Sequence, residues 1–215
     1  MLSAVTVWWG LPAVLALVDW YAVARGDRRT ETWAKPATLV ALVLVACVLG
    51  ATDTAAGVWL LVALVLSLAG DVLLLGDSET RFRLGLGSFL LGHLAFVVAF
   101  TRLGLESPGW LWIAWLVLFV CLITTRRVVP ATFLRGGRAL VFPVAIYTVV
   151  IGAMVIFAFD TGEPLIAVGA TVFAASDSIL AVNRFVSPRL WAPVAVMVTY
   201  HVGQALIVAG VLAAT

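Results

Sequence analysis

Two aspartates stand in apolar stretches that leave little room for charge. Asp71 lies in "SLAGDVLLLGD" (67–77), and Asp177 lies in "FAASDSILAVN" (173–183). An aspartate inside a hydrocarbon-spanning helix costs about 2.5–3.5 kcal/mol on insertion scales, so each is a candidate functional residue. Two carboxyl groups brought together at low dielectric cannot both ionise cheaply, so one is expected to keep its proton. Such a pair suits protonation of an electron-rich carbon while water is activated nearby.

The composition indicates which elements must position these acids. Of the 215 residues, 64% are hydrophobic and 11% are charged, and the mean hydropathy is +1.16. Soluble proteins carry about 25% charged residues, so the sequence predicts a polytopic membrane protein with a single domain over residues 1–215. At about 20 apolar residues per span, we predict an all-α bundle of eight transmembrane helices near 4–24, 36–51, 57–75, 84–102, 110–128, 139–159, 164–183 and 191–213.

The basic residues predict the orientation of this bundle. The connections after the first, third, fifth and seventh predicted spans hold 12 of the 13 Lys and Arg residues, namely Arg25, Arg28, Arg29, Lys35, Arg81, Arg83, Arg126, Arg127, Arg135, Arg138, Arg184 and Arg189. Only Arg102 falls on the other side. Cytoplasmic loops carry the excess of positive charge. Both termini are therefore predicted to be non-cytoplasmic.

Depth in the membrane follows from the rise of 1.5 Å per helical residue. Asp71 is expected about 6 Å, and Asp177 about 9 Å, from the cytoplasmic ends of their spans. His93 and Tyr200 each come about 13 Å into a span, and Gln204 lies one turn deeper than Tyr200. We therefore predict a multi-pass protein of the cell membrane whose active site lies toward the cytoplasmic side.

The spacing of the two acids has a second regularity. Asp71 and Asp177 are 106 residues apart, about half the chain, and each is followed after three residues by a leucine. His93 comes 22 residues after the first acid and Tyr200 comes 23 residues after the second. One interpretation is a tandem repeat of four spans, with parallel halves related by a pseudo-two-fold axis. Chance similarity among leucine- and alanine-rich helices is the other, and the sequence leaves both open.

Further polar residues are candidates for binding a substrate, and each also has a structural interpretation. The candidates are Lys35, His93, Ser176, Asn183, Tyr200 and Gln204. Interior polar side chains also hold helices together, and a lysine at a span boundary usually extends its ammonium to the interface. Asp19 and His201 are interpreted as structural. Cys47 and Cys121 have no zinc-type spacing, so no metal, disulfide or cofactor is predicted.

Four motifs in register resemble the YhhN/TMEM86 lysoplasmalogenase family of small eight-helix membrane proteins. They are "LAGDVLLL" around Asp71, "GLGSFLLGHLAF" (85–96), "AASDSILA" (174–181) and "YHVGQALI" (200–207), while the first two spans match only loosely, at Lys35-Pro36. The resemblance implies cleavage of the vinyl ether bond of a lysoplasmalogen, which releases a fatty aldehyde and a glycerophospho-base. It implies Asp71 and Asp177 as the catalytic pair. The implied partners are a lysophospholipid and membrane lipids, with no nucleic acid.

Other functions stay open at this point. Intramembrane acids and internal repeats also occur in transporters of small solutes or lipids. Intramembrane aspartyl proteases pair two acids as well, but their Gly-x-Gly-Asp signature is missing because position 68 is Leu68. A lipid-binding or assembly scaffold would use the acids only to hold helices together. The physiological substrate, whether lysoplasmalogen or another ether lysolipid, is also open.

Overall fold

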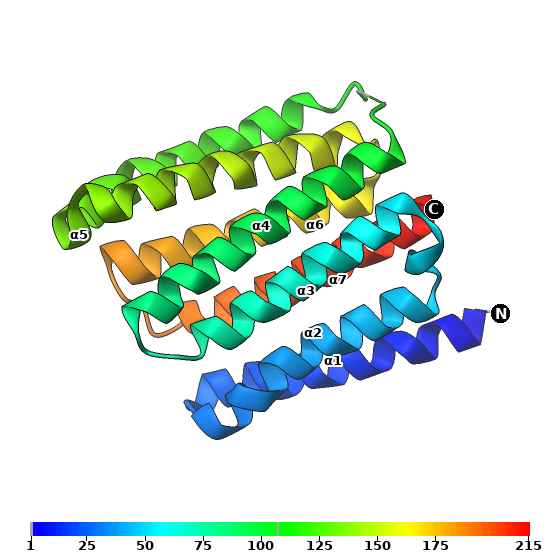
Figure 1. Ribbon diagram of the computed structural model, residues 1–215, viewed down its shortest axis with the longest axis horizontal. Coiled ribbons are helices and arrows are strands. Elements are labelled where there is room, and N and C mark those ends of the chain that lie inside the picture. The colour runs from blue at the N-terminus through cyan, green and yellow to red at the C-terminus, as the bar shows by residue number, and fades with distance from the viewer. Residues whose placement is uncertain (1, 107) are drawn as a thin grey trace. The chain divides into compact units, whose positions relative to one another are not determined.

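The computed structural model describes residues 2–106 and 108–215, apart from the side chains of 2–6, 135, 136 and 138–140. Two residues of the predicted orientation signal, Arg135 and Arg138, therefore have side chains outside the described part. The elements are α1 (Leu2–Arg25), α2 (Arg28–Val48), the 3-10 turn η1 (Ala51–Asp53), α3 (Ala55–Leu74), α4 (Glu79–Leu103), α5 (Trp112–Asp160), α6 (Pro164–Ala181), the π-helical segment η2 (Val182–Val186) and α7 (Ala192–Ala214) (Figure 1). The described residues form no strand.

Eight of these helical segments are long and apolar enough to cross a membrane, counted over the described residues. Helix α5 supplies two of them, Trp112–Leu134 and Val141–Asp160. Between the two lies Gly137, whose φ of 59° and ψ of −155° are not helical, and such a conformation favours glycine. The predicted all-α, eight-span fold class is confirmed. The side of the membrane that holds the termini, and the four-span repeat, stay predictions.

The described chain divides into two compact units. Unit 1 is Met1–Gly104 with Val208–Thr215, and unit 2 is Leu105–Ile207. The sequence favoured one domain over residues 1–215, which stays a prediction. Each unit is described by itself below, because each has its own buried interior and one of the two predicted catalytic aspartates.

Glycines bring α3 and α4 together in unit 1, where the two helices run side by side (Figure 1). A Cβ on Gly70 would lie 2.6 Å from the ring of Phe89, and one on Gly92 would lie 3.3 Å from Ser67 Oγ. The hydroxyl of Ser88 donates to the carbonyl of Leu66 at 2.6 Å. These contacts set the register of the pair, with Phe89 opposite the residue that precedes Asp71.

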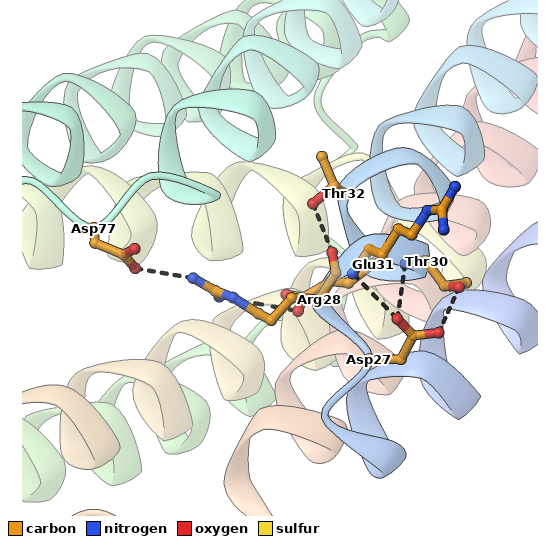
Figure 2. Close-up of polar contacts among 7 residues, drawn as sticks. Asp27, Arg28, Thr30, Glu31, Thr32 and Asp77 are labelled. Carbon is orange, nitrogen blue, oxygen red and sulfur yellow. Dashed lines mark hydrogen bonds and ion pairs between the residues drawn. The ribbon is translucent and has the colours of Figure 1, made fainter.

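A polar network holds the start of α2 (Figure 2). Asp27 caps the helix, because its carboxylate accepts from the backbone N–H groups of Arg29 and Thr30 at 3.1 and 3.2 Å, and from the Thr30 hydroxyl at 2.6 Å. Arg28 donates to Asp77 at 2.9 Å, from the connection between α3 and α4. The cap fixes the first residue of α2, and the ion pair fixes the beginning of α2 against the end of α3.

Close backbone contact joins α6 to α7 in unit 2. A Cβ on Gly169 would lie 3.0 Å from the carbonyl oxygen of Gly203, and one on Gly203 would lie 2.9 Å from the backbone nitrogen of Phe173. Only residues without a side chain allow helices to approach so closely. At another end of the unit, the N–H of Glu106 donates to the carbonyl of Asp160 at 2.8 Å. The elements around Asp177 are therefore held by backbone as well as by side chains.

The Asp27 cap predicts a pH-dependent contribution to stability. Its hydrogen bond with the side chain of Thr30 is the largest cause that holds the pKa of Asp27 below its ordinary value of 3.8. A lowered folded-state pKa adds stability above pH 3.8, and this stability is lost as the pH falls through the lower folded value. We expect Asp27→Ala to unfold at a lower temperature than wild type at neutral pH, with the difference shrinking below pH 3.8.

Thermal unfolding in detergent, followed by circular dichroism across this pH range, measures the effect. Asp53→Ala is the matched control, because Asp53 is an exposed acid of unit 1 that does not cap α2. A difference between wild type and Asp27→Ala that stays constant with pH would contradict the assignment of the cap to the ionised carboxylate.

Candidate functional site

Asp71 forms a buried ion pair with Lys35. The two atoms Lys35 Nζ and Asp71 Oδ1 are 3.2 Å apart, and the side chains are 6% and 1% exposed. Lys35 therefore does not extend to the interface, although the sequence placed it at the mouth of the second span. The reason is that α2 begins at Arg28 and continues through Pro36, so Lys35 lies inside the helix. A role for Lys35 toward a lipid phosphate stays a prediction.

Each of the first four helices contributes one buried ionisable side chain to unit 1. These are Asp19 from α1, Lys35 from α2, Asp71 from α3 and His93 from α4, all of them buried residues. Asp19 lies within electrostatic range of both Lys35 and Asp71. The interpretation of Asp19 as a structural residue stays a prediction.

His93 lies one helical turn from the level of Asp71. Gly92 packs against Ser67, and Ser67 is four residues, or about 6 Å along the axis, before Asp71. The Nδ1 atom of His93 lies 2.6 Å from the carbonyl oxygen of Phe89. Because a carbonyl only accepts, Nδ1 carries the hydrogen and Nε2 is the acceptor of the ring.

Asp177 has a neutral partner in unit 2. The Tyr147 hydroxyl, from the second half of α5, donates to Asp177 Oδ2 at 2.7 Å. Cys121, from the first half of α5, forms a hydrogen bond with the side chain of Ser178 and lies within electrostatic range of Asp177. Tyr147 was not predicted from the sequence, although it stands as a polar residue in the middle of the apolar stretch "FPVAIYTVV" (142–150).

The remaining predicted residues of unit 2 lie in α6, the π-helical segment η2 and α7. Ser176 donates to the carbonyl of Val196 at 3.0 Å, and Asn183 Oδ1 accepts from the N–H of Arg189 at 2.8 Å. Tyr200 meets the Phe173 ring edge-on, with the ring centroids 5.4 Å apart. Gln204 is 0% exposed, and its amide forms no hydrogen bond with the described residues. The bonds of Ser176 and Asn183 join backbone segments, and the substrate-binding roles of all four residues stay predictions.

The geometry therefore gives each aspartate its own partner within its own unit. The predicted meeting of Asp71 and Asp177 at one substrate stays a prediction. No group of three or more His, Cys, Asp or Glu side chains that could hold a metal ion occurs over residues 2–106 and 108–215. The chemistry open to these side chains is proton transfer, with a lysine beside Asp71 and a tyrosine beside Asp177.

A model of the YhhN family matches residues 30–211, which include Lys35, Asp71, Tyr147 and Asp177. The chain belongs to the YhhN family. With eight apolar spans among the described residues, this family member is a multi-pass membrane protein. No solved structure matches the chain.

This YhhN family member is similar to three proteins that carry the name lysoplasmalogenase. The chain is 36% identical over 155 residues to "Lysoplasmalogenase" of Mycobacterium bovis and, equally, of Mycobacterium tuberculosis, which covers 71% of this chain and 59% of each relative. It is 30% identical over 145 residues to human "Lysoplasmalogenase TMEM86B", which covers 67% of this chain and 59% of that protein. The chain thus spans about three fifths of the length of these curated relatives.

The buried ion pair predicts a large and cooperative effect on stability. Lys35→Met leaves the Asp71 charge buried without its cation, which costs about 3–5 kcal/mol of unfolding free energy. The double variant Lys35→Met/Asp71→Leu is expected to recover most of this loss, because an apolar pair often replaces a buried ion pair at little cost. Unfolding by denaturant in detergent micelles, analysed as a double-mutant cycle, gives the coupling energy.

The exposed pair Arg28–Asp77 provides the matched control. Its side chains are 61% and 92% exposed, so the cycle Arg28→Met and Asp77→Leu should show a coupling below about 1 kcal/mol. Equal coupling energies for the two cycles would contradict the burial of Lys35 with Asp71.

Proposed function

We propose that this YhhN family member is a membrane-embedded hydrolase of the lysoplasmalogenase type. Its substrate is a lysoplasmalogen or a related ether lysolipid, and its products are a fatty aldehyde and a glycerophospho-base. The observation that carries the proposal is the pair of intramembrane aspartates, each bonded to a positioned partner, Lys35 or Tyr147. The names of the three relatives support the same reaction.

The chemistry of a vinyl ether requires an acid and a base. Protonation of the alkene carbon remote from the ether oxygen uses the π electrons of the C=C bond, which becomes a single bond, and gives an oxocarbenium ion. Water then adds to the carbon that bears the oxygen and loses a proton, which forms a hemiacetal. The hemiacetal collapses as its C–O bond breaks, its hydroxyl proton is lost and the glycerol oxygen takes up a proton. One water is consumed, and the catalytic groups regain their starting protons.

We propose that one of Asp71 and Asp177 donates the first proton to the alkene carbon. The other carboxyl group activates the water. Paired carboxyl groups divide this work in glycosidases, whose transition state is also an oxocarbenium ion. The Lys35 ammonium, 3.2 Å from Asp71 Oδ1, compensates the charge of that carboxylate. The Tyr147 hydroxyl donates to Asp177 Oδ2 and so fixes the position of that carboxyl group.

Two buried side chains suit the polar part of the lysolipid. His93 is buried, and its Nδ1 donates to the carbonyl oxygen of Phe89. The Gln204 amide is fully buried and can both donate and accept. We propose His93 in unit 1 and Gln204 in unit 2 as substrate-binding residues.

The location of the site is proposed to be the cytoplasmic half of the cell membrane. Arg81 begins the basic connection that the sequence assigned to the cytoplasm, and its guanidinium donates to the carbonyls of Val72 and Leu73 at 2.8 and 3.3 Å. It therefore caps α3 directly beyond Asp71. This contact supports a reaction centre near the basic end of unit 1.

Aldehyde release from lysoplasmalogen by the purified protein in detergent tests the proposal. We expect Asp71→Asn and Asp177→Asn each to lower turnover by about 10²-fold or more, because each removes a general acid or base but keeps its shape. Asp53→Asn, an exposed acid, is the control and should keep wild-type turnover.

Folded asparagine variants with full turnover would contradict the two-aspartate mechanism. A wild-type protein that is inert on all vinyl ethers would contradict the substrate class. Substrate flux into proteoliposomes without cleavage would favour the transporter alternative instead.

The hydrogen bond from Tyr147 predicts a smaller and separate effect. Tyr147→Phe keeps the ring but removes the donor to Asp177, and a hydrogen bond to a charged group contributes about 1.5 kcal/mol or more. We therefore expect about a tenfold loss of kcat with little change in KM, measured by the same aldehyde assay. Tyr21→Phe, an exposed tyrosine beside Arg25, is the control. Equal kcat values for the two variants would remove Tyr147 from the mechanism.

A further inference from the structure

Four exposed arginines of unit 2 take no part in the reaction proposed above. They are Arg126 and Arg127 from the first half of α5, Arg184 from η2, and Arg189 from the connection between η2 and α7. We call these four residues the arginine cluster. They are far apart in the sequence, so the packing of unit 2 decides whether they can act together.

The register of α5 against α6 brings the arginine cluster to one level of unit 2. The first half of α5 runs in the same direction as α6, because the second half of α5 turns back at Gly137 and ends where α6 begins. Cys121 forms a hydrogen bond with the side chain of Ser178, so these two residues are level. The two arginines of α5 come five and six residues after Cys121, and Arg184 comes six residues after Ser178. Each is therefore about 8–9 Å beyond this contact along its helix axis.

The connection after η2 adds the fourth arginine. The N–H of Arg189 donates to Asn183 Oδ1 at 2.8 Å, which folds the connection back onto the residue before Arg184. Segment η2 also packs against α5, and Figure 1 shows η2 and the turn of α5 at the same end of the unit. The cluster thus occupies one end of unit 2.

This end of unit 2 has no acid to balance its arginines. The acidic residues of the unit are Glu106, Asp160, Glu163 and Asp177. The first three lie at the opposite end, where α5 ends and α6 begins. Asp177 accepts the hydrogen bond of Tyr147 and comes seven residues, or about 10 Å, before Arg184. No Asp or Glu occurs over residues 178–207.

The basic end of unit 1 differs, because its charges are paired. Arg28 lies 4.0 Å from Glu31 and 2.9 Å from Asp77, and Arg83 lies 3.4 Å from Glu79. An excess of basic residues is a general feature of cytoplasmic loops, and unit 1 shows that such an excess can be neutralised within the chain. The charge of the arginine cluster is not neutralised in this way. An anion from outside the chain would do so.

Exposed apolar side chains beside the cluster indicate what kind of anion this is. Leu190 and Trp191 directly follow Arg189 and are 102% and 60% exposed, and Leu134 lies seven residues beyond Arg127 and is 85% exposed. Tryptophan is enriched at the level of the lipid headgroups. A small soluble anion would contact the guanidinium groups alone, whereas a phospholipid would cover the neighbouring apolar side chains as well.

We propose that the arginine cluster binds the headgroup of an anionic phospholipid of the surrounding membrane. Guanidinium groups bind phosphate oxygens through paired, charge-assisted hydrogen bonds. A zwitterionic headgroup also carries a positive group, and this end of unit 2 offers that group no acid. The lipid is therefore one whose headgroup has no positive charge, such as phosphatidylglycerol. It would hold the basic end of unit 2 at the membrane surface.

Native mass spectrometry of the full chain tests this binding without any lysoplasmalogen, so the result does not depend on the proposed function. The protein is released from detergent micelles that contain phosphatidylglycerol or phosphatidylcholine with the same acyl chains, and the apparent Kd of the first bound lipid is measured. We expect wild type to bind phosphatidylglycerol at least about tenfold more tightly, because each arginine near an anionic group contributes about fivefold.

Two double variants make the test specific for the cluster. Arg126→Gln/Arg127→Gln should weaken phosphatidylglycerol binding by about tenfold or more and leave phosphatidylcholine binding unchanged. Arg25→Gln/Arg83→Gln removes the same charge from exposed positions of unit 1 and should leave both affinities unchanged. If the first variant is not recovered folded, Arg184→Gln/Arg189→Gln should show the same loss.

Three results would overturn the proposal. Equal affinities of wild type for the two lipids would show that the headgroup charge is not recognised. Equal weakening by the variants of unit 1 and unit 2 would show that only the net charge of the chain matters. Displacement of phosphatidylglycerol by an equal concentration of inorganic phosphate would show a site for a free anion and not for a lipid.

Discussion

The ion pair between Lys35 and Asp71 is the constraint to which the rest of unit 1 conforms. Two charges removed from water must meet closely, since a buried charge without its partner is strongly destabilising. Helix α2 therefore has to start at a fixed residue, and the Asp27 cap fixes it at Arg28. The exposed pair Arg28–Asp77 joins the same two segments as the buried pair. Arg28 comes seven residues before Lys35, and Asp77 comes six residues after Asp71. The glycine contacts of α3 with α4 then hold Asp71 in place.

Unit 2 positions its aspartate by different means. Asp177 accepts a hydrogen bond from the hydroxyl of Tyr147. The non-helical backbone at Gly137 divides α5 into two halves, and the second half supplies Tyr147. The two carboxyl groups consequently have different electrostatic surroundings, one with an ammonium and one with a hydroxyl. Unlike surroundings are how a pair of carboxyl groups comes to serve as acid and base at one pH.

The sequence predicted the number of spans correctly, because hydropathy and polar breaks are local properties. The predicted second span began at Pro36, which left Lys35 outside the helix. A proline is tolerated inside a membrane helix, and the Asp27 cap starts α2 earlier, at Arg28. Tyr147 was missed for a different reason. It is a polar residue in an apolar stretch, and only the packing of one helix against another determines which face is turned inward. Periodicity alone carries no information about that neighbour.

We propose that Asp71 and Asp177 act on the same lipid. The most direct measurement is photolabelling with a non-cleavable alkyl ether lysolipid that carries a diazirine beside the ether carbon, followed by mass spectrometry of the labelled peptides. The account predicts labels in both α3 near Asp71 and α6 near Asp177, each displaced by unlabelled lysoplasmalogen. Labels confined to one of these helices, or spread over lipid-facing residues regardless of competitor, would contradict it.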